Sequence, residues 1–176
     1  VEARSAARLA VQTRGPMYIR LGKNGEPLIH DSSLSFNVGQ MVEVAPAGDI
    51  TFITVGSIAS QVAQAASMLL GEGFSIGFFT SPSVTPFDGK SLREIYRRSR
   101  LLVTVEEHVS VGGLASIVAE QLVSMNNRTC SSRSLTLPRE IQGVGTQEFL
   151  LLKYQLDAES IARTVRTAFL GESLRG

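Results

Sequence analysis

The densest group of ionisable residues in this chain of 176 residues is Glu106-Glu107-His108, which follows an apolar run. If that run is a strand, its two-residue period places Glu106 and His108 on one face and Glu107 on the other. A carboxylate beside an imidazole can orient the ring for proton transfer, or it can tie a loop down. A metal site normally needs three protein ligands, and the only other histidine, His30, lies far away in a polar stretch. We therefore expect no metal site, and we favour a structural or interface role for this group over a catalytic one.

A pair of glycines, Gly112 and Gly113, opens the next expected helix, and Val55-Gly56-Ser57 leads from a strand directly into another. In open α/β sheets, ligands bind beyond the carboxyl ends of strands, near helix N-termini. Free N–H groups at such turns can hold a phosphate. Neither turn has the spacing of a phosphate-binding fingerprint. We therefore expect Gly112 and Gly113 to allow a sharp turn and close packing, with phosphate binding as the alternative.

Two cations, Arg20 and Lys23, flank the end of a short apolar run. They are candidates for binding a phosphate or a carboxylate, and solvated surface cations are the alternative. Cys130 is the only cysteine, which excludes an internal disulfide and any site with several thiolate ligands. The chain has no Gly-x-Ser-x-Gly sequence, so it lacks the nucleophile elbow of many hydrolases.

The elements that would position these residues alternate along the chain. A helix is expected over 2–12 and a short strand over 17–21, followed by a polar, turn-rich linker. The helix over 57–73, with Ser57 as N-cap, has no charge between 57 and 70. A helix with so wide an apolar surface must be covered on more than one side, by the chain's last helices or by a second copy. Further strands are expected at 41–44, 49–56, 74–80, 101–108 and 132–138, and further helices at 90–100, 110–125, 147–154 and 158–170.

Strands that alternate with helices of 10–15 residues are typical of βαβ units. The prediction is an α/β fold in three layers, with a mostly parallel five-stranded sheet, one antiparallel edge strand and helices on both faces. We expect the runs 41–44 and 49–56 to form the antiparallel pair.

Composition narrows the possible functions. The chain is 43% hydrophobic, and 17 Lys and Arg against 16 Asp and Glu leave a net charge of +1. This charge gives no basic field for nucleic acid, and no apolar run approaches the ~20 residues that span a bilayer. We therefore expect no nucleic-acid partner, no membrane and a cytoplasmic protein. The first residue is Val1 rather than Met, which suggests a piece of a longer protein.

Several segments of the chain resemble the transketolase family. They are GPMYIRLGKNGEP (15–27), SPSVTPFDGKSL (81–92), LLVTVEEHVSVGGLASIVAEQL (101–122) and TQEFLLLKYQLDAESIARTVRTAF (146–169). The order and content of these segments are most similar to the C-terminal subunit of split transketolases. Deoxyxylulose phosphate synthases and 2-oxoacid dehydrogenase beta subunits resemble the chain more distantly.

The resemblance implies an enzyme of three parts that uses thiamine diphosphate and Mg²⁺ to move a two-carbon ketol unit between sugar phosphates. Residues 1–24 would be the tail of its pyrimidine-binding domain, 25–40 a linker and 41–176 the C-terminal domain. The catalytic and cofactor-binding groups would lie elsewhere in the parent, so none is expected in this chain and no cofactor is expected on it alone. The family's phosphate-binding arginine falls at Lys23, with Arg20 nearby, and lysine lacks the bidentate fork of arginine.

The partners implied are the missing N-terminal domains or subunit and a second copy of this chain, giving a homodimer through the sheet edge and the 108–114 turn. Two alternatives remain open. One is a deoxyxylulose phosphate synthase or 2-oxoacid dehydrogenase component, and the other is a free-standing interaction module that is not an enzyme.

Overall fold

The computed structural model describes residues 1–22, 25, 27–125, 130–140 and 143–173. The five strands are β1 (Val42–Ala45), β2 (Ile50–Val55), β3 (Ile76–Thr80), β4 (Leu101–Val109) and β5 (Ser131–Leu137). They form one sheet in the order β1-β3-β2-β4-β5, in which β1 is antiparallel to β3 and the other neighbours are parallel. The predicted fold class is therefore confirmed.

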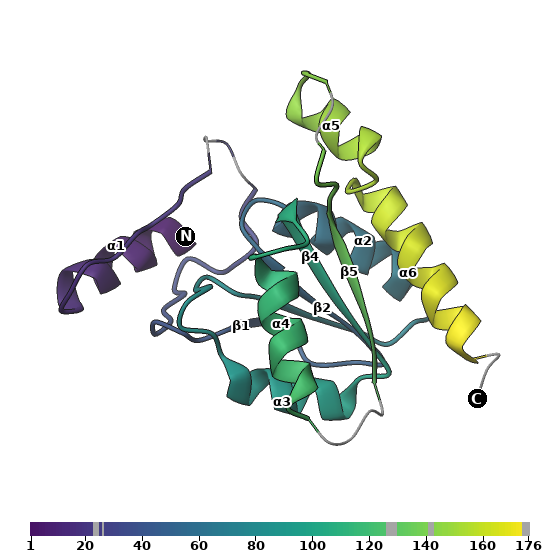
Figure 1. The fold of residues 1–176 in the computed structure, drawn as a ribbon, viewed down its shortest axis with the longest axis horizontal. Coiled ribbons are helices and arrows are strands. Elements are labelled where there is room, and N and C mark those ends of the chain that lie inside the picture. The colour runs from purple at the N-terminus through teal and green to yellow at the C-terminus, as the bar shows by residue number, and fades with distance from the viewer. Residues whose placement is uncertain (23–24, 26, 126–129, 141–142, 174–176) are drawn as a thin grey trace.

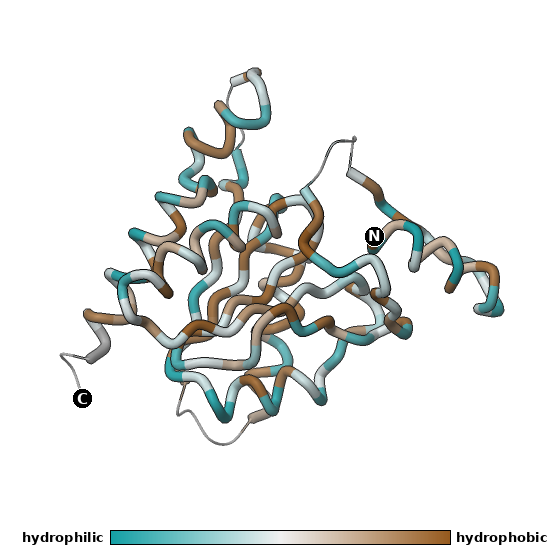
Figure 2. Tube along the Cα trace, turned by 180° about the vertical axis from the view of Figure 1, so that it is seen from behind, coloured by the Kyte–Doolittle hydropathy of each residue, from teal (hydrophilic) through white to brown (hydrophobic). Residues whose placement is uncertain are grey.

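Helices cover both faces of the sheet (Figure 1). The helices are α1 (Glu2–Gln12), α2 (Ala59–Gly71), α3 (Gly89–Arg98), α4 (Leu114–Val123), α5 (Gln147–Lys153) and α6 (Ala158–Ser173). The apolar core on one face joins the sheet to α2 and α6, and the core on the other joins it to α3 and α4. Successive strand residues serve opposite cores, since Phe52 faces α2 and Ile53 faces α3 and α4. Accordingly, hydrophobic segments of the trace gather in the middle of the sheet in Figure 2.

The charge-free helix α2 is covered twice, as expected. Val62, Ala65 and Leu69 are completely buried in the core that also holds Ile161 and Val165 of α6. The Asp157 carboxylate accepts a hydrogen bond from the N–H of Ser160 at 3.0 Å, so it caps the start of α6. The second cover of α2 is thus the chain's own last helix.

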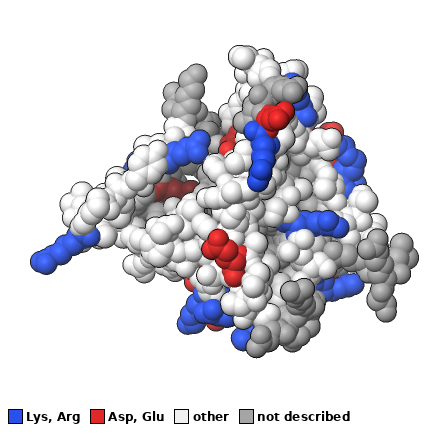
Figure 3. Space-filling model, in the orientation of Figure 1, with Lys and Arg blue, Asp and Glu red and all other residues white. Residues whose placement is uncertain are grey.

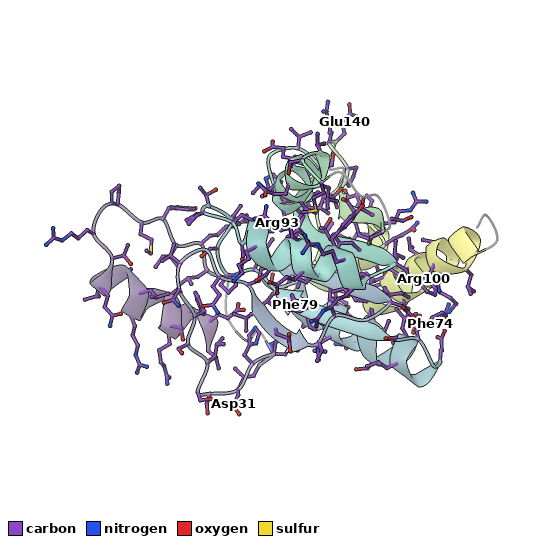
Figure 4. The ribbon with its side chains drawn as sticks, turned by 90° about the horizontal axis from the view of Figure 1, so that it is seen from below. Asp31, Phe74, Phe79, Arg93, Arg100 and Glu140 are labelled. Carbon is purple, nitrogen blue, oxygen red and sulfur yellow. The ribbon has the colours of Figure 1, made fainter. Side chains whose placement is uncertain are left out.

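The end of the sheet at which β4 begins is closed by aromatic contacts. The rings of Phe74 and Phe169 meet edge to face at 5.8 Å, and the Arg100 guanidinium lies 4.8 Å from the Phe169 centroid. Figure 4 shows Phe74 and Arg100 at this end, far from Asp31, while Phe79 lies within the body of the fold. The ionisable residues that follow β3 and β4 lie at the opposite end of the sheet.

The expected antiparallel pairing was wrong in one respect, because β1 pairs with β3 and not with β2. The chain passes from β1 to β2 across the start of β3, and glycines make room for this crossing. A Cβ on Gly77 would lie 2.6 Å from the Cα of Ala47, and a Cβ on Gly48 would lie 2.7 Å from the Ser75 backbone. The connection is short, yet it carries the chain past a neighbouring strand.

The strand expected over 17–21 was also wrong. Residues 17–22 are exposed, and the structure assigns them neither strand nor helix. A strand needs neighbouring strands for its backbone hydrogen bonds, and the sheet of the described residues ends at β1 on one side and at β5 on the other. None of the described helices is both long enough and apolar enough for a membrane span.

Candidate functional site

The carboxyl ends of β2 and β4 form the place where this sheet type binds ligands. After β2 the chain enters α2 on one face, and after β4 it enters α4 on the other. The two strands are neighbours, so a topological switch point lies between them. The residues that the sequence predicts for chemistry, Ser57 and 106–113, meet here.

The Glu106 carboxylate lies at the N-terminus of α4 and bonds to its backbone N–H groups. Its side chain is only 2% exposed, and its two carboxylate oxygens accept hydrogen bonds from the N–H groups of Leu114 and Ala115, each at 2.8 Å. A negative charge at a helix N-terminus is stabilised by the free N–H groups and by the helix dipole. The carboxylate thus occupies the groups that would otherwise be offered to a phosphate.

The two glycines serve this arrangement in different ways. A Cβ on Gly113 would lie 2.1 Å from the Glu106 Oε2 atom, so only glycine allows the carboxylate to approach the helix. Gly112 has open space around its Cα, but its φ of +83° lies in the left-handed region. Its N–H donates to the Ser116 hydroxyl at 2.9 Å. The geometry matches close packing and a sharp turn.

Glu107 points to the other side of the sheet and joins three elements. Its Oε2 atom accepts a hydrogen bond from the Ser57 hydroxyl at 2.5 Å, and its Oε1 atom accepts one from the Gln147 side chain at 3.2 Å. These bonds connect the turn after β2, the end of β4 and the start of α5. The expectation that Ser57 caps its helix was wrong, because Ile58 is the N-cap residue of α2 and the Ser57 hydroxyl is used by Glu107.

His108 is exposed, and its Nδ1 atom lies 2.8 Å from the carbonyl oxygen of the next residue, Val109. Both oxygens of Glu106 bond to N–H groups of α4, so this carboxylate does not orient the imidazole for proton transfer. Arg20 is exposed in the extended segment after α1, and Lys23 lies outside the described residues. Cys130 is buried.

A second polar group, which the sequence did not reveal, lies at the carboxyl end of β3. The Nε2 atom of His30 is 2.8 Å from Glu2 Oε1 and 2.9 Å from the Thr80 hydroxyl oxygen. The Thr80 hydroxyl also donates to the same Glu2 oxygen at 2.9 Å. These three residues, the Glu2–His30–Thr80 cluster, are 28 to 78 positions apart in the chain. No sequence pattern relates residues at such distances, and His30 was assigned only to the linker.

Asp88 is a further carboxylate at this edge and connects the linker to α3. It accepts hydrogen bonds from the N–H groups of Ser91, at 3.0 Å, and Met41, at 3.1 Å. Burial alone would raise the pKa of Asp88, but these bonds and the bond from the Ser91 hydroxyl outweigh it, and the pKa lies below its ordinary value. The carboxylate caps the helix and holds the residue at which the polar stretch ends.

These side chains do not make a cofactor site. Among the residues that the structure describes, no three of His, Cys, Asp and Glu are grouped so that they could hold a metal ion. The one glycine-rich helix start at the switch point is closed by Glu106. In the described part of the chain, a diphosphate with its Mg²⁺ thus finds no group of metal ligands, and the N–H groups of Leu114 and Ala115 at the start of α4 already bond to Glu106. On the face drawn in Figure 3, basic and acidic side chains are dispersed and form no patch of a single sign.

The chain is similar to a transketolase subunit and to a deoxyxylulose phosphate synthase. The chain is 27% identical over 164 residues to one subunit of the apulose-4-phosphate transketolase of Phocaeicola vulgatus, covering 93% of this chain and 52% of that protein. It is 31% identical over 169 residues to 1-deoxy-D-xylulose-5-phosphate synthase of Syntrophotalea carbinolica, covering 94% of this chain and 26% of the synthase. The chain thus spans about half the length of the first relative and about a quarter of the second.

A solved structure has the same fold. A split-gene transketolase, described as an inactive beta4 tetramer, superposes with a TM-score of 0.87 at 30% identity over 95% of this chain and 54% of its own. The family model described as "Transketolase, C-terminal domain" matches residues 39–161, well over half of the chain. With this match, the resemblance drawn from the sequence motifs is confirmed: the chain belongs to the transketolase C-terminal domain family.

Proposed function

We propose that this chain is the C-terminal part of a transketolase-like enzyme that transfers a two-carbon ketol unit between sugar phosphates. Its own task is to build a scaffold and an interface, while another subunit or segment carries the catalytic groups. The observation that carries the proposal is the likeness to the split-gene transketolase over 95% of the chain. The apulose-4-phosphate transketolase relatives, each named as one subunit of an enzyme, support it further.

Thiamine diphosphate and Mg²⁺ belong, in this proposal, to the parent enzyme and not to this chain. When bound, the cofactor supplies an ylid that stabilises a carbanion, which the protein must position and shield. In this proposal, the residues of this chain fix the conformation of the turns at the switch point. Glu106 closes the start of α4, and Glu107 fixes Ser57 and Gln147, so the edge that faces the missing parts has a defined shape.

The domain division follows from the same proposal. Residues 1–24 complete the pyrimidine-binding domain, 25–40 form the linker and 41–176 form the C-terminal domain. The segment 17–21 supports this division, because Tyr18 is 89% exposed and Leu21 is 63% exposed. An extended apolar segment of this kind suits a strand that joins the sheet of a preceding domain. Arg20, in that segment, and Lys23 are the proposed contacts to the substrate phosphate.

A second copy of the chain is the other proposed partner. Val111, Phe149 and Leu152 are each more than half exposed, on the turn after β4 and on α5. The bond between Glu107 and Gln147 brings these two elements together. An exposed apolar group of this kind suits an interface. The tetramer named for the split-gene relative is consistent with contacts between copies.

The alternative within the same cofactor class is a deoxyxylulose phosphate synthase, which the 31% identity to the Syntrophotalea enzyme favours. The test is to co-express the chain with the subunit or segment that supplies the other two domains. The complex is assayed with thiamine diphosphate and Mg²⁺ in two reactions. One contains a ketose phosphate donor and an aldose phosphate acceptor, and the other contains pyruvate, which loses CO2, and glyceraldehyde 3-phosphate as acceptor. We expect two-carbon transfer by the complex and none by the chain alone. Formation of 1-deoxyxylulose 5-phosphate alone would favour the alternative, and no product dependent on thiamine diphosphate would contradict both.

A further inference from the structure

The N-terminal arm, residues 1–21, is held by polar contacts at one end. Helix α1 has no buried residue, and in Figure 1 it extends away from the body, the described residues from 28 onward, with its first turn nearest to it. That turn supplies hydrogen bonds to the body. Glu2 bonds within the Glu2–His30–Thr80 cluster, and the Ser5 hydroxyl donates to the Leu34 carbonyl at 2.7 Å. In the part of the chain that the structure describes, these bonds thus connect the first turn of α1 to the body.

The body holds its half of the cluster firmly. Thr80 is the last residue of β3 and is 3% exposed, and the His30 side chain is 7% exposed. The stretch that follows His30 is fixed to the loop after β3, because the N–H of Gly39 donates to the Ser83 hydroxyl at 3.0 Å and the N–H of Met41 donates to Asp88. The body thus holds the His30 imidazole and the Thr80 hydroxyl in position to bind the Glu2 carboxylate of the arm.

The three contacts of the cluster determine which of its atoms are hydrogen-bond donors and which are acceptors. Glu2 Oε1 accepts the Thr80 hydroxyl proton, so the Thr80 oxygen has only lone pairs left for His30. Nε2 of His30 faces this oxygen and the Glu2 oxygen, both acceptors. Nε2 must therefore carry a proton, which it shares between them. The carboxylate is the one acceptor that collects both donors, and replacing it removes the arm's share of the cluster.

We propose that the Glu2–His30–Thr80 cluster is a positioning latch that fixes the N-terminal arm on the carboxyl end of β3, and with it Arg20. The latch adds to the proposed function a means of positioning the arm, and the part that concerns Arg20 rests on that function. Arg20 lies at the end of the arm, eighteen positions after Glu2, and it is exposed. The Glu2–His30–Thr80 cluster, at the start of the arm, thereby determines where the Arg20 guanidinium contacts a substrate phosphate.

The first test uses the chain itself and does not depend on any activity. Hydrogen exchange of residues 2–12 is compared between the unchanged chain and the variants Thr80→Val, Thr80→Ser and Glu2→Ala. Thr80→Val keeps the shape and removes the hydroxyl, so we expect exchange in α1 to rise roughly five-fold, the size of one net hydrogen bond. Thr80→Ser keeps the hydroxyl and should restore the original rate. Glu2→Ala, on the arm, should reproduce the rise with the body intact.

The matched control is Thr54→Val. Thr54 is the register partner of Thr80 on β2 and is also buried, but its hydroxyl donates to the Val105 carbonyl at 2.8 Å. We expect this variant to leave exchange in α1 unchanged. Unchanged exchange in Thr80→Val and Glu2→Ala, or an equal rise in Thr54→Val, would overturn the latch.

The second test uses the complete enzyme and measures what a purely structural role would not change. We expect Glu2→Ala to raise KM for the phosphorylated sugar several-fold with little change in kcat, and a double variant with Arg20→Ala to be no worse than Arg20→Ala alone. Additive effects, or an unchanged KM, would overturn the link to Arg20. Absence of ketol transfer in the complete protein would contradict the proposed function instead, while the exchange experiment would still decide the latch.

Discussion

Glu106 and Glu2 are carboxylates at the same end of the sheet, but they have different roles in the structure. Glu106 is almost completely buried and bonds to backbone N–H groups only eight and nine positions away in the chain. The Glu2 side chain is 35% exposed and reaches a hydroxyl 78 positions away. The first closes a helix inside the domain, and the second joins the domain to an arm. Burial and backbone donors close in the chain make a carboxylate part of the fold, whereas a partly exposed carboxylate with long-range bonds to side chains connects two parts of the molecule.

The largest effect is expected at Glu106. Glu106→Ala leaves the N–H groups of Leu114 and Ala115 buried without an acceptor, and it removes a charge from the start of α4. We expect the free energy of unfolding to fall by about 3 kcal/mol, since bonds to charged groups cost most when one partner is lost. Chemical denaturation measures this value. Glu107→Gln is the control on the neighbouring, half-buried position, and an equal loss there would remove the contrast between the two glutamates.

The glycines should rank next, for separate reasons. Gly113→Ala would push a methyl group into the Glu106 carboxylate and should cost about 2 kcal/mol in the free energy of unfolding. Gly112→Ala meets no atoms but strains a residue with φ of +83°, and it should cost about 1 kcal/mol. Denaturation of both variants in the Glu106→Ala background sharpens the comparison. There the cost of Gly113→Ala should shrink and that of Gly112→Ala should not, and the reverse result would contradict the assigned contacts.

Asp88 gives a smaller effect that depends on pH. Hydrogen bonds lower its pKa from the ordinary value of 3.8, so the folded state holds the charged form more strongly than the unfolded state does. Its stabilising contribution is complete above that ordinary value and is lost as the pH falls through the lowered folded-state pKa. Asp88→Asn should therefore flatten the acid side of a stability curve measured by denaturation at several pH values. A curve that stays as steep would assign the acid sensitivity to other groups.

The smallest effect on global stability is expected at Glu2. Glu2→Ala removes the acceptor of two hydrogen bonds, but His30 and Thr80 can still bond to each other and the helix of the arm has no buried residue. The free energy of unfolding should therefore change by less than about 0.5 kcal/mol. Thermal denaturation followed by circular dichroism measures this. A loss as large as that of Glu106→Ala would mean that the arm is part of the cooperative fold, and the comparison between the two carboxylates would fail.

The fold was more predictable than the site for a physical reason. Strands such as β2 and β3 are buried on both faces and read as continuous apolar runs, and α2 has no charge because α6 covers it. These signals are local. The pairing of β1 with β3 depends on a chain crossing beside Gly77, which the local sequence does not indicate. The segment 17–21 has the local composition of a strand, but it has no neighbouring strand in the described sheet.

Site residues were identified only where they adjoin in sequence. Glu106, Glu107 and the glycines were found because they lie together, but the partners of the glutamates depend on how the turn after β4 meets α4, α2 and α5. His30 lay in a stretch treated as a linker, and Thr80 was one residue of an apolar run. Their contact with Glu2 arises only when the arm, the linker and β3 are placed together.

We propose above that this chain supports a thiamine diphosphate enzyme without itself holding the cofactor. Isothermal titration calorimetry of thiamine diphosphate with Mg²⁺, first into the chain alone and then into its complex with the missing domains, tests it most directly. We predict heat of binding from the complex and none from the chain alone. Saturable binding to the chain alone, or none to a properly assembled complex, would contradict the account.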